Sequence, residues 1–168
     1  MTERRFLDGY GGQTTEGLLA LEDEYRPDSI VLAFEAGVAA KAERLGGSDR
    51  LTMAERVILV VEALEREVNS DGFDGLFRVA ADIVPDLVGA LVAIGRPDVA
   101  EIAAAAIAAL RLSGDPTPDA VAAAMDVDDD DRDDRLGRLD DRYYATAGDL
   151  ADPLMAYIRG ATDEIVLP

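Results

Sequence analysis

The residues of this chain with the clearest potential for chemistry are carboxylates, and many of them are crowded into one stretch. Residues 124–144 read AMDVDDDDRDDRLGRLDDRYY and contain nine aspartates. Acids at alternate positions are typical of a calcium-binding EF-hand loop, which also needs glycine at position 6 and a bidentate glutamate at position 12. Counted from Asp126, those positions hold Asp131 and Gly137, so neither the required glycine nor the required glutamate is present. We therefore expect no EF-hand here, and no metal ligands in the chain.

A second set of carboxylates lies on one predicted helix. Glu62 and Glu65 form a Glu-x-x-Glu pair, and Glu55 lies two turns earlier on roughly the same face. Helical carboxylates of this kind hold Mg²⁺ in all-α nucleotide pyrophosphohydrolases, so a magnesium-dependent enzyme is one alternative. A second paired motif is missing, however, and the simpler interpretation is a solvated helix face.

The composition narrows the possible chemistry further. The chain has no histidine and no cysteine. Histidine general bases, thiolate nucleophiles and zinc sites built from these residues are thereby excluded. We expect a protein that is not an enzyme, with no catalytic residue and no cofactor.

The charge of the chain indicates the kind of partner it attracts. There are 35 acidic and 16 basic side chains, a net charge of −19, and residues 115–152 alone carry 13 acidic against 4 basic. Such a surface repels nucleic acids and anionic lipids, and it attracts basic proteins. Solubility, a high-GC genome or adaptation to salt would also explain the excess of acids. We expect a basic protein partner, with no direct binding to nucleic acid or membrane.

The elements that position these residues are predicted to be helices. Hydrophobic residues make up 49 % of the chain and aromatic residues only 5 %, and no stretch alternates as a strand would. The sequence predicts an all-α fold of about seven to eight helices, with a short N-terminal arm. We expect this arm, residues 1–26, to be loosely attached and to lead through a short helical turn into a single helical domain, residues 27–168.

Capping signals place the individual helices. Thr52 and Glu55 match the capping box, and Thr117 followed by Pro118 is a strong helix start. The expected helices cover residues 28–45, 53–69, 73–84, 85–94, 98–112, 118–125 and 131–144. The longest apolar run, residues 102–110, is too short to span a bilayer, and the N-terminus lacks the apolar segment of a signal peptide. A cytoplasmic location is expected.

The acidic stretch is predicted to form two pieces. Asp126–Asp130 is expected to be a loop and helix cap, and Asp131–Tyr144 an amphipathic helix. The apolar stripe that docks this helix is Leu136, Leu139 and Tyr143.

Arginines four residues after an aspartate predict ion pairs within this block. The expected pairs are Asp128–Arg132, Asp131–Arg135 and Asp134–Arg138. The aspartates expected to lack a local cation are Asp126, Asp129, Asp130 and Asp133. The full set of candidate partner-binding carboxylates is Asp126, Asp128, Asp129, Asp130, Asp133, Asp134, Asp140 and Asp141.

The spacing of these acids suggests what they imitate. Carboxylates four residues apart on a helix are separated by about 6 Å along its axis, which is similar in scale to the phosphate spacing along a nucleic-acid strand. A helix of this kind could engage the Lys and Arg side chains that grip DNA, with an affinity that falls as salt rises.

The segment LEREVNSDGFDGLF, residues 64–77, resembles the signature of the bacterial acidic DNA-mimic protein family. The segments YGGQTTEGLLALEDEYRPDSIVLAFE and LDDRYYATAGDLADPLMAYI are also similar to it. The residues that match the family motif are Glu67, Val68, Asn69, Gly72 and Phe73. The resemblance implies an all-α fold, often a homodimer, whose negative surface replaces double-stranded DNA on a DNA-binding transcriptional regulator. It also implies a structural role for the motif, in which Asn69 and Gly72 shape a turn and Phe73 fills the core.

An inhibitor or immunity-type partner of a basic toxin or nuclease would need the same charge pattern. The sequence does not separate this alternative from DNA mimicry.

Overall fold

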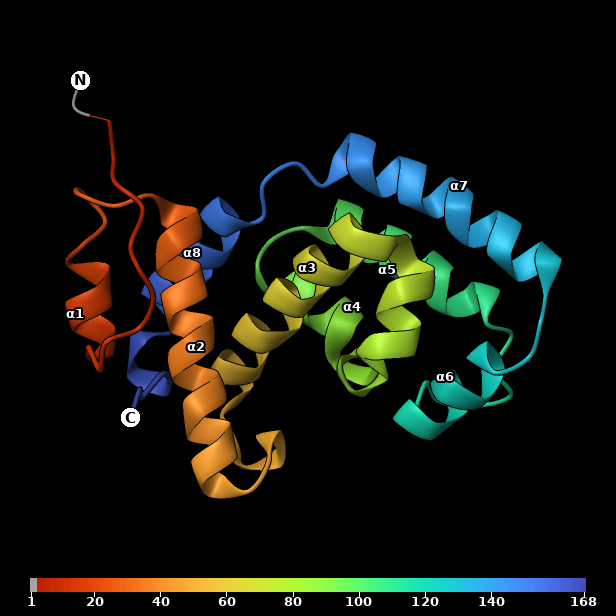
Figure 1. Cartoon of the computed structure of the whole chain (residues 1–168), viewed down its shortest axis with the longest axis horizontal. Coiled ribbons are helices and arrows are strands. Elements are labelled where there is room, and N and C mark those ends of the chain that lie inside the picture. The colour runs from red at the N-terminus through yellow and green to blue at the C-terminus, as the bar shows by residue number, and fades with distance from the viewer. Residues whose placement is uncertain (1–2) are drawn as a thin grey trace. The chain divides into compact units, whose positions relative to one another are not determined.

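The computed structural model describes residues 3–168, and the secondary structure in that range is helical except for one isolated parallel bridge between Arg5 and Tyr25 (Figure 1). The predicted all-α fold class is confirmed. The helices are α1 (Thr15–Leu19), α2 (Pro27–Leu45), α3 (Met53–Val79), α4 (Val84–Ala93), α5 (Pro97–Ala109), α6 (Pro118–Met125), α7 (Asp130–Thr146) and α8 (Ala151–Gly160). The short 3₁₀ helices are Ser48–Arg50, Ala81–Ile83 and Thr162–Glu164. None of the helices within residues 3–168 has the length and apolar character needed to cross a membrane.

The predicted caps form the starts of two helices. At the start of α3, Thr52 Oγ1 accepts a hydrogen bond from the Glu55 N–H at 3.1 Å, and Glu55 Oε2 accepts one from the Thr52 N–H at 3.0 Å. At the start of α6, Thr117 Oγ1 accepts from the Ala120 N–H at 3.3 Å. These side chains satisfy backbone donors that have no partner within the helix.

The chain divides into two compact units. The first consists of Met1–Glu62 and Ala151–Pro168, and the second is Ala63–Leu150. In the first unit, α2, the first turns of α3 and α8 contribute buried side chains such as Ile30, Ile58 and Leu154.

The N-terminal segment of the first unit is docked rather than loosely attached. The hydroxyl of Thr15 donates to the Ile165 carbonyl at 2.7 Å, and the Tyr10 hydroxyl donates to the Pro168 carbonyl at 2.7 Å. Leu18 of α1 is fully buried. The partners lie about 150 residues away in sequence (|i−j| of 150 and 158), so no local pattern indicated this attachment.

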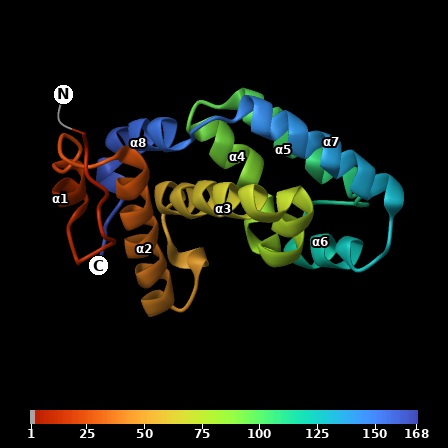
Figure 2. The same ribbon diagram turned by 45° about the horizontal axis from the view of Figure 1, so that its top comes forward.

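The second unit is built from the later turns of α3 and from α4 to α7. Helices α5 and α7 pack side by side, as both Figure 1 and Figure 2 show. Its core contains an aromatic cluster in which Phe73 lies 6.1 Å from Phe77 and, edge to face, 5.9 Å from Tyr143, between ring centroids. Edge-to-face packing is the favourable geometry for such rings. This cluster attaches α7 to α3.

Two helix ends differ from those predicted. The helix expected over residues 73–84 ends at Val79, and its last residues form a separate 3₁₀ turn before α4. The helix expected to continue to residue 112 ends at Ala109, and Arg111 then adopts a left-handed conformation with φ of 53°. A left-handed residue just beyond a helix is a common termination, although it is normally glycine.

Candidate functional site

A sharp bend in α3 sets the position of α7. The bend lies at Asp71 and Gly72, and Gly72 has φ of +68° and ψ of −169°. The backbone N–H of Phe73, freed by the bend, donates to Asp140 Oδ1 of α7 at 2.8 Å. A side chain at position 72 would clash with this carboxylate. The motif glycine therefore allows a contact between the two helices that no other residue would permit.

A second bond fixes the same end of α7. The Tyr144 hydroxyl donates to the carbonyl of Val68 at 2.7 Å. Val68 and Phe73 are fully buried, whereas Asn69 is exposed and Glu67 pairs with Arg66 at 3.2 Å. The segment that resembles the family motif thus supports α7 and contributes to the core.

The first turn of α7 is capped by Asp129. Its Oδ1 accepts from the Arg132 N–H at 3.0 Å, and its other oxygen forms an ion pair with Arg111. The pKa of Asp129 is lowered. The main cause is the hydrogen bond from the Arg132 N–H, and the Arg111 guanidinium adds to it. Helix α7 accordingly begins at Asp130, one residue before the predicted start.

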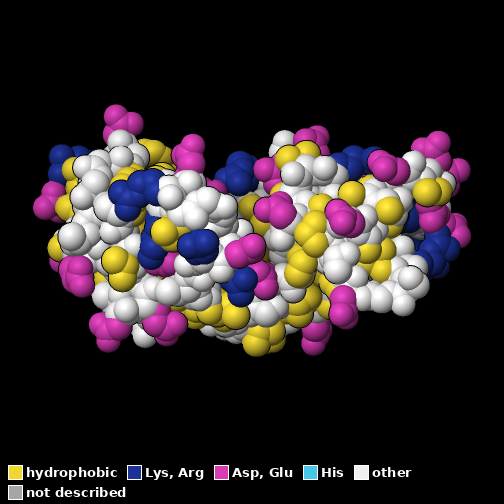
Figure 3. All heavy atoms as spheres, turned by 90° about the horizontal axis from the view of Figure 1, so that it is seen from below, with side chains coloured by type: hydrophobic (Ala, Val, Ile, Leu, Met, Phe, Trp, Pro, Cys, Tyr) yellow, Lys and Arg dark blue, Asp and Glu magenta, His cyan; other side chains and the backbone are white. Residues whose placement is uncertain are grey.

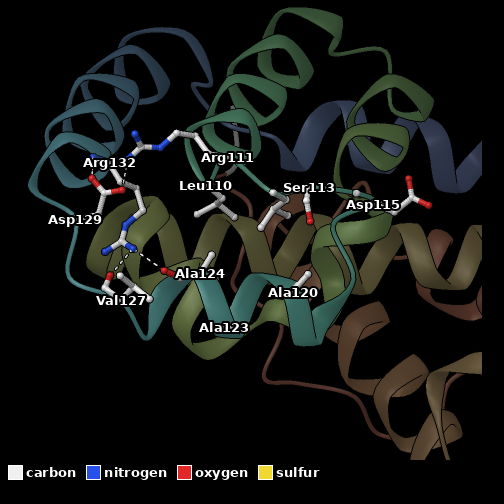
Figure 4. A pocket seen from close by; sticks show the side chains of 12 residues that line it. Leu110, Arg111, Ser113, Asp115, Ala120, Ala123, Ala124, Val127, Asp129 and Arg132 are labelled. Carbon is white, nitrogen blue, oxygen red and sulfur yellow. Dashed lines mark hydrogen bonds and ion pairs between the residues drawn. The ribbon is translucent and has the colours of Figure 1, made fainter.

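Arg132 shapes the acidic loop from the inside. Its side chain is 3 % exposed, and its Nη1 donates to the carbonyls of Ala124 at 2.7 Å and Val127 at 2.8 Å. Figure 4 shows the guanidinium directed at the end of α6, beside a pocket of about 570 Å³. Its Nε donates to Asp133 at 2.9 Å. One buried cation therefore holds the end of α6, the loop and the first turn of α7 together.

The predicted pairing of the acids is wrong in several respects. Arg132 does not bond to Asp128, because position 132 lies on the same helix face as Leu136 and Tyr143 and turns inward. Asp129 and Asp133, expected to lack a cation, pair with Arg111 and Arg132. Within residues 3–168 no ion pair joins the other two predicted partners. These pairs are Asp131–Arg135 and Asp134–Arg138.

Most of the exposed charges of α7 lie in two rows according to their sign, although Asp131 lies on the arginine side, four residues before Arg135. Asp130, Asp134 and Asp141 follow one another at helical spacing and are exposed, and Asp133 lies beside them. Arg135, Arg138 and Arg142 form a different row, at i, i+3 and i+7. The helix therefore has a carboxylate row (Asp130, Asp133, Asp134 and Asp141) and an arginine row (Arg135, Arg138 and Arg142).

The structure places the remaining candidate carboxylates in two settings. Asp126 and Asp128 are exposed in the loop before α7. Asp140 is partly buried against the bend in α3, and this burial raises the pKa of Asp140, while the Phe73 N–H opposes the shift. The candidate residues are thus brought to one end and one side of α7, with Asp129 and Asp140 directed into the fold.

Acidic side chains also occur away from α7. The second unit carries 20 acidic and 8 basic side chains, a net of −12, and the first unit carries the remaining −7. On the face drawn in Figure 3 the acidic side chains lie in separate groups, with apolar and basic side chains between them.

Two of the three glutamates of the alternative magnesium site, Glu55 and Glu65, have partners within the protein. Glu55 is fully buried, and its Oε1 accepts from Lys41 Nζ at 2.5 Å and from the Val166 N–H at 3.0 Å. Burial and the charge of Asp149 raise the pKa of Glu65 to about 7, although the Leu150 N–H opposes the shift. No three Asp or Glu side chains in the described residues are grouped as ligands for a metal ion.

The roles of two arginine side chains, Arg132 and Arg111, were not predicted from the sequence. The inward direction of Arg132 follows from its position on the apolar stripe of α7, so a helical wheel contains that signal. The ion pair of Arg111 with Asp129 spans 18 residues and depends on the left-handed turn after α5, for which the sequence holds no signal.

The fold and this surface define a class of protein: an all-α, strongly acidic chain that presents carboxylates on a rigidly supported helix. Residues 49–161 match the sequence profile of the family described as DMP19-like protein, which covers more than half of the chain. The chain therefore belongs to the DMP19-like protein family, whose name refers to DNA mimic protein 19. No curated protein and no solved structure matches it.

Proposed function

We propose that this protein is a non-enzymatic mimic of double-stranded DNA that occupies a basic DNA-binding protein, such as a transcriptional regulator. The observation that carries the proposal is the carboxylate row of α7, which lies on a capped and anchored helix. Membership of the DMP19-like family supports the proposal. A rigid display of charge matters because ordering flexible acids on binding would cost conformational entropy.

The proposed contact surface is the carboxylate row together with Asp126 and Asp128 of the preceding loop. From Asp130 to Asp141 the row extends about 16 Å along the helix axis, at 1.5 Å per residue. This length is enough to engage several of the Lys and Arg side chains that would otherwise contact consecutive phosphates. Asp129 and Asp140 act indirectly, because one caps α7 and the other anchors it.

The proposal extends to the setting in which the protein works. The mimic acts in the cytoplasm, where it meets proteins that bind the chromosome, and it acts as a homodimer, as the family resemblance implies. A dimer would present two carboxylate rows, which suits a regulator that reads two half-sites of duplex DNA.

The test compares two variants of equal charge. In the first, Asp130, Asp134 and Asp141 are replaced by asparagine. In the matched control, Asp8, Asp49 and Asp163 of the first unit are replaced, which removes the same charge from exposed positions. Each protein is immobilised and used at low salt to capture DNA-binding proteins from the lysate of its own cell. The captured protein is then purified and titrated with and without duplex DNA.

We expect the wild-type protein to capture a DNA-binding protein that duplex DNA displaces and that salt releases steeply. The α7 variant should bind it at least about tenfold more weakly, a loss of roughly 1.4 kcal/mol, and the control less than about twofold. Equal losses in both variants would mean that only net charge matters, and would contradict the assigned surface. Capture of a nuclease or toxin, with no regulator, would favour the inhibitor alternative.

A further inference from the structure

A groove lies between α5 and α7, on the side of α7 away from the carboxylate row. It has a volume of about 420 Å³ and is formed by two kinds of side chain. The floor consists of Ala105, Ala108, Ala109 and Leu139, and the wall on α7 consists of the arginine row. We call this feature the α5–α7 groove.

The arginine row is without acidic partners inside the protein. Arg135, Arg138 and Arg142 are exposed, and within residues 3–168 no salt bridge joins any of them to a carboxylate. This is notable in a chain that carries 35 acidic side chains, because other arginines of the same unit, Arg78 and Arg96, are paired. The three guanidiniums span about 10 Å along the helix, at 1.5 Å per residue.

Mimicry of DNA does not account for this row. Duplex DNA presents phosphates to its binding proteins and has no fixed cation, so a row of guanidiniums has no counterpart in the molecule being imitated. The row instead complements carboxylates. Guanidinium groups bind carboxylates through two parallel hydrogen bonds. This pairing selects for the direction from which the carboxylate approaches as well as for its negative charge.

The floor of the groove indicates the shape of the occupant. Ala105, Ala108 and Ala109 lie at i, i+3 and i+4 on α5, so they form one strip of small apolar side chains beside Leu139. A small anion would satisfy the arginines and leave this strip in water. An amphipathic helix would cover the strip with its apolar face and reach the arginines with acids on its edge, which is the helix-in-groove mode of recognition.

We propose that the α5–α7 groove binds an acidic amphipathic helix of a partner protein. The bound helix places small apolar side chains on the alanine strip and carboxylates, spaced i, i+3 or i+4, and i+7, against Arg135, Arg138 and Arg142. This second interaction surface goes beyond the proposed mimicry, and it uses none of the residues of the carboxylate row.

The test uses a synthetic peptide of about 15 residues, a length at which an isolated helix begins to form. Its glutamates lie along one edge of an alanine- and leucine-rich face. A control peptide has the same composition with its glutamates distributed around the helix. Binding is measured by fluorescence anisotropy at about 0.1 M salt, where charges more than about 10 Å away are screened. The methyl NMR signals of Ala105, Ala108 and Ala109 report the location.

Variants of the protein separate the two components of the groove. Arg135→Gln with Arg138→Gln removes two wall cations, and the matched control, Arg44→Gln with Arg50→Gln, removes two exposed cations from the first unit. Ala108→Phe fills the groove from an exposed position without changing the charge. Circular dichroism checks that each variant is folded.

We expect the patterned peptide to bind, to shift the three alanine methyl signals, and to bind at least about tenfold more tightly than the control peptide. The wall variant and Ala108→Phe should each weaken binding about tenfold or more, and the first-unit control less than about twofold. Equal binding of both peptides, or equal perturbation by inorganic phosphate, would overturn the proposal in favour of a simple anion site. The proposal would also be overturned if the wall variant changed the sedimentation of the protein but not its binding of the peptide. The occupant of the groove would then be a second copy of the chain.

Discussion

Asp140 of α7 supplies a helix cap to α3, since its Oδ1 accepts the Phe73 N–H at 2.8 Å immediately after the bend at Gly72. A helix that restarts after a bend has backbone donors without partners, and these are normally satisfied by a side chain just before them in sequence. Here the cap comes from 67 residues away. The local structure of the motif segment and the position of α7 are therefore coupled.

Replacement of Gly72 by alanine tests this coupling. The variant would place a side chain at φ of +68° and against the Asp140 carboxylate. We expect a loss of unfolding free energy of about 2–4 kcal/mol, from backbone strain and the lost cap together. Urea unfolding measures it.

Gly89→Ala is the matched control, because Gly89 is an exposed helical residue of α4 with open space around it. It should be neutral or stabilising by up to about 1 kcal/mol. Equal destabilisation by both changes would argue against a special role for the bend.

Arg132→Ala should release the acidic loop. The change removes the donor that holds the Ala124 and Val127 carbonyls, and hydrogen bonds to a charged group contribute roughly 1.5–3 kcal/mol each when buried. We expect a loss of about 3–6 kcal/mol for the two bonds, with faster amide hydrogen exchange confined to residues 124–133. Arg135→Gln, an exposed change on the same helix, should alter stability by no more than about 0.5 kcal/mol. Unchanged exchange in the loop would contradict the assigned role of Arg132.

The stability of the second unit should depend on pH through Glu65. Burial and the charge of Asp149 raise the pKa of Glu65 to about 7 in the folded chain, against 4.5 for an ordinary glutamate. Between these values the folded state binds a proton that the unfolded state has released, so the unfolding free energy falls as pH rises from about 4.5 through 7.

Glu65→Gln should flatten this part of the pH profile, because glutamine keeps an acceptor for the Leu150 N–H and carries no titrating group. Denaturant unfolding at a series of pH values measures the effect, with Glu101→Gln, an exposed change on α5, as the control. A wild-type profile already flat between pH 5 and 8 would show that Glu65 does not titrate as described.

Lys41→Met should strongly destabilise the first unit. Lys41 Nζ lies 2.5 Å from Oε1 of the fully buried Glu55. Burial by itself raises the pKa of Glu55, but the bonds from Lys41, the Val166 N–H and the Thr52 N–H outweigh it, so the pKa is lowered overall. Removing one member of a buried pair leaves an uncompensated charge, which typically costs about 3–5 kcal/mol.

The pH profile identifies the cause of that loss. Because the folded-state pKa of Glu55 is lowered, its contribution to stability is present above about pH 4.5 and is lost as pH falls through the folded value. In Lys41→Met this acid-side decline should become shallower. The double change Lys41→Met with Glu55→Gln should recover part of the stability, since it removes the unpaired charge. A double variant less stable than Lys41→Met would contradict this account.

The sequence by itself determined the local structure of this protein. The capping box at Thr52 and Glu55 and the cap at Thr117 lie where they were predicted, because a cap joins a side chain to a backbone group only two or three residues away. The division of the acidic stretch into a loop and a helix was predicted to within one residue for the same reason. The family resemblance also depended on sequence alone, and the match over residues 49–161 confirms the family.

Only the tertiary structure decided which charged side chains are free to contact a partner. Asp129 and Asp140 belong to the same acidic run as Asp130 and Asp141. In the fold, however, Asp129 pairs with Arg111, and Asp140 accepts the Phe73 N–H. A helical wheel of α7 already places Arg132 on the apolar stripe and most of the carboxylates apart from the arginines. It does not show that Asp129 pairs with Arg111 or that Asp140 accepts the Phe73 N–H. These two contacts join residues 18 and 67 positions apart, and contacts of that kind leave no local pattern in the sequence.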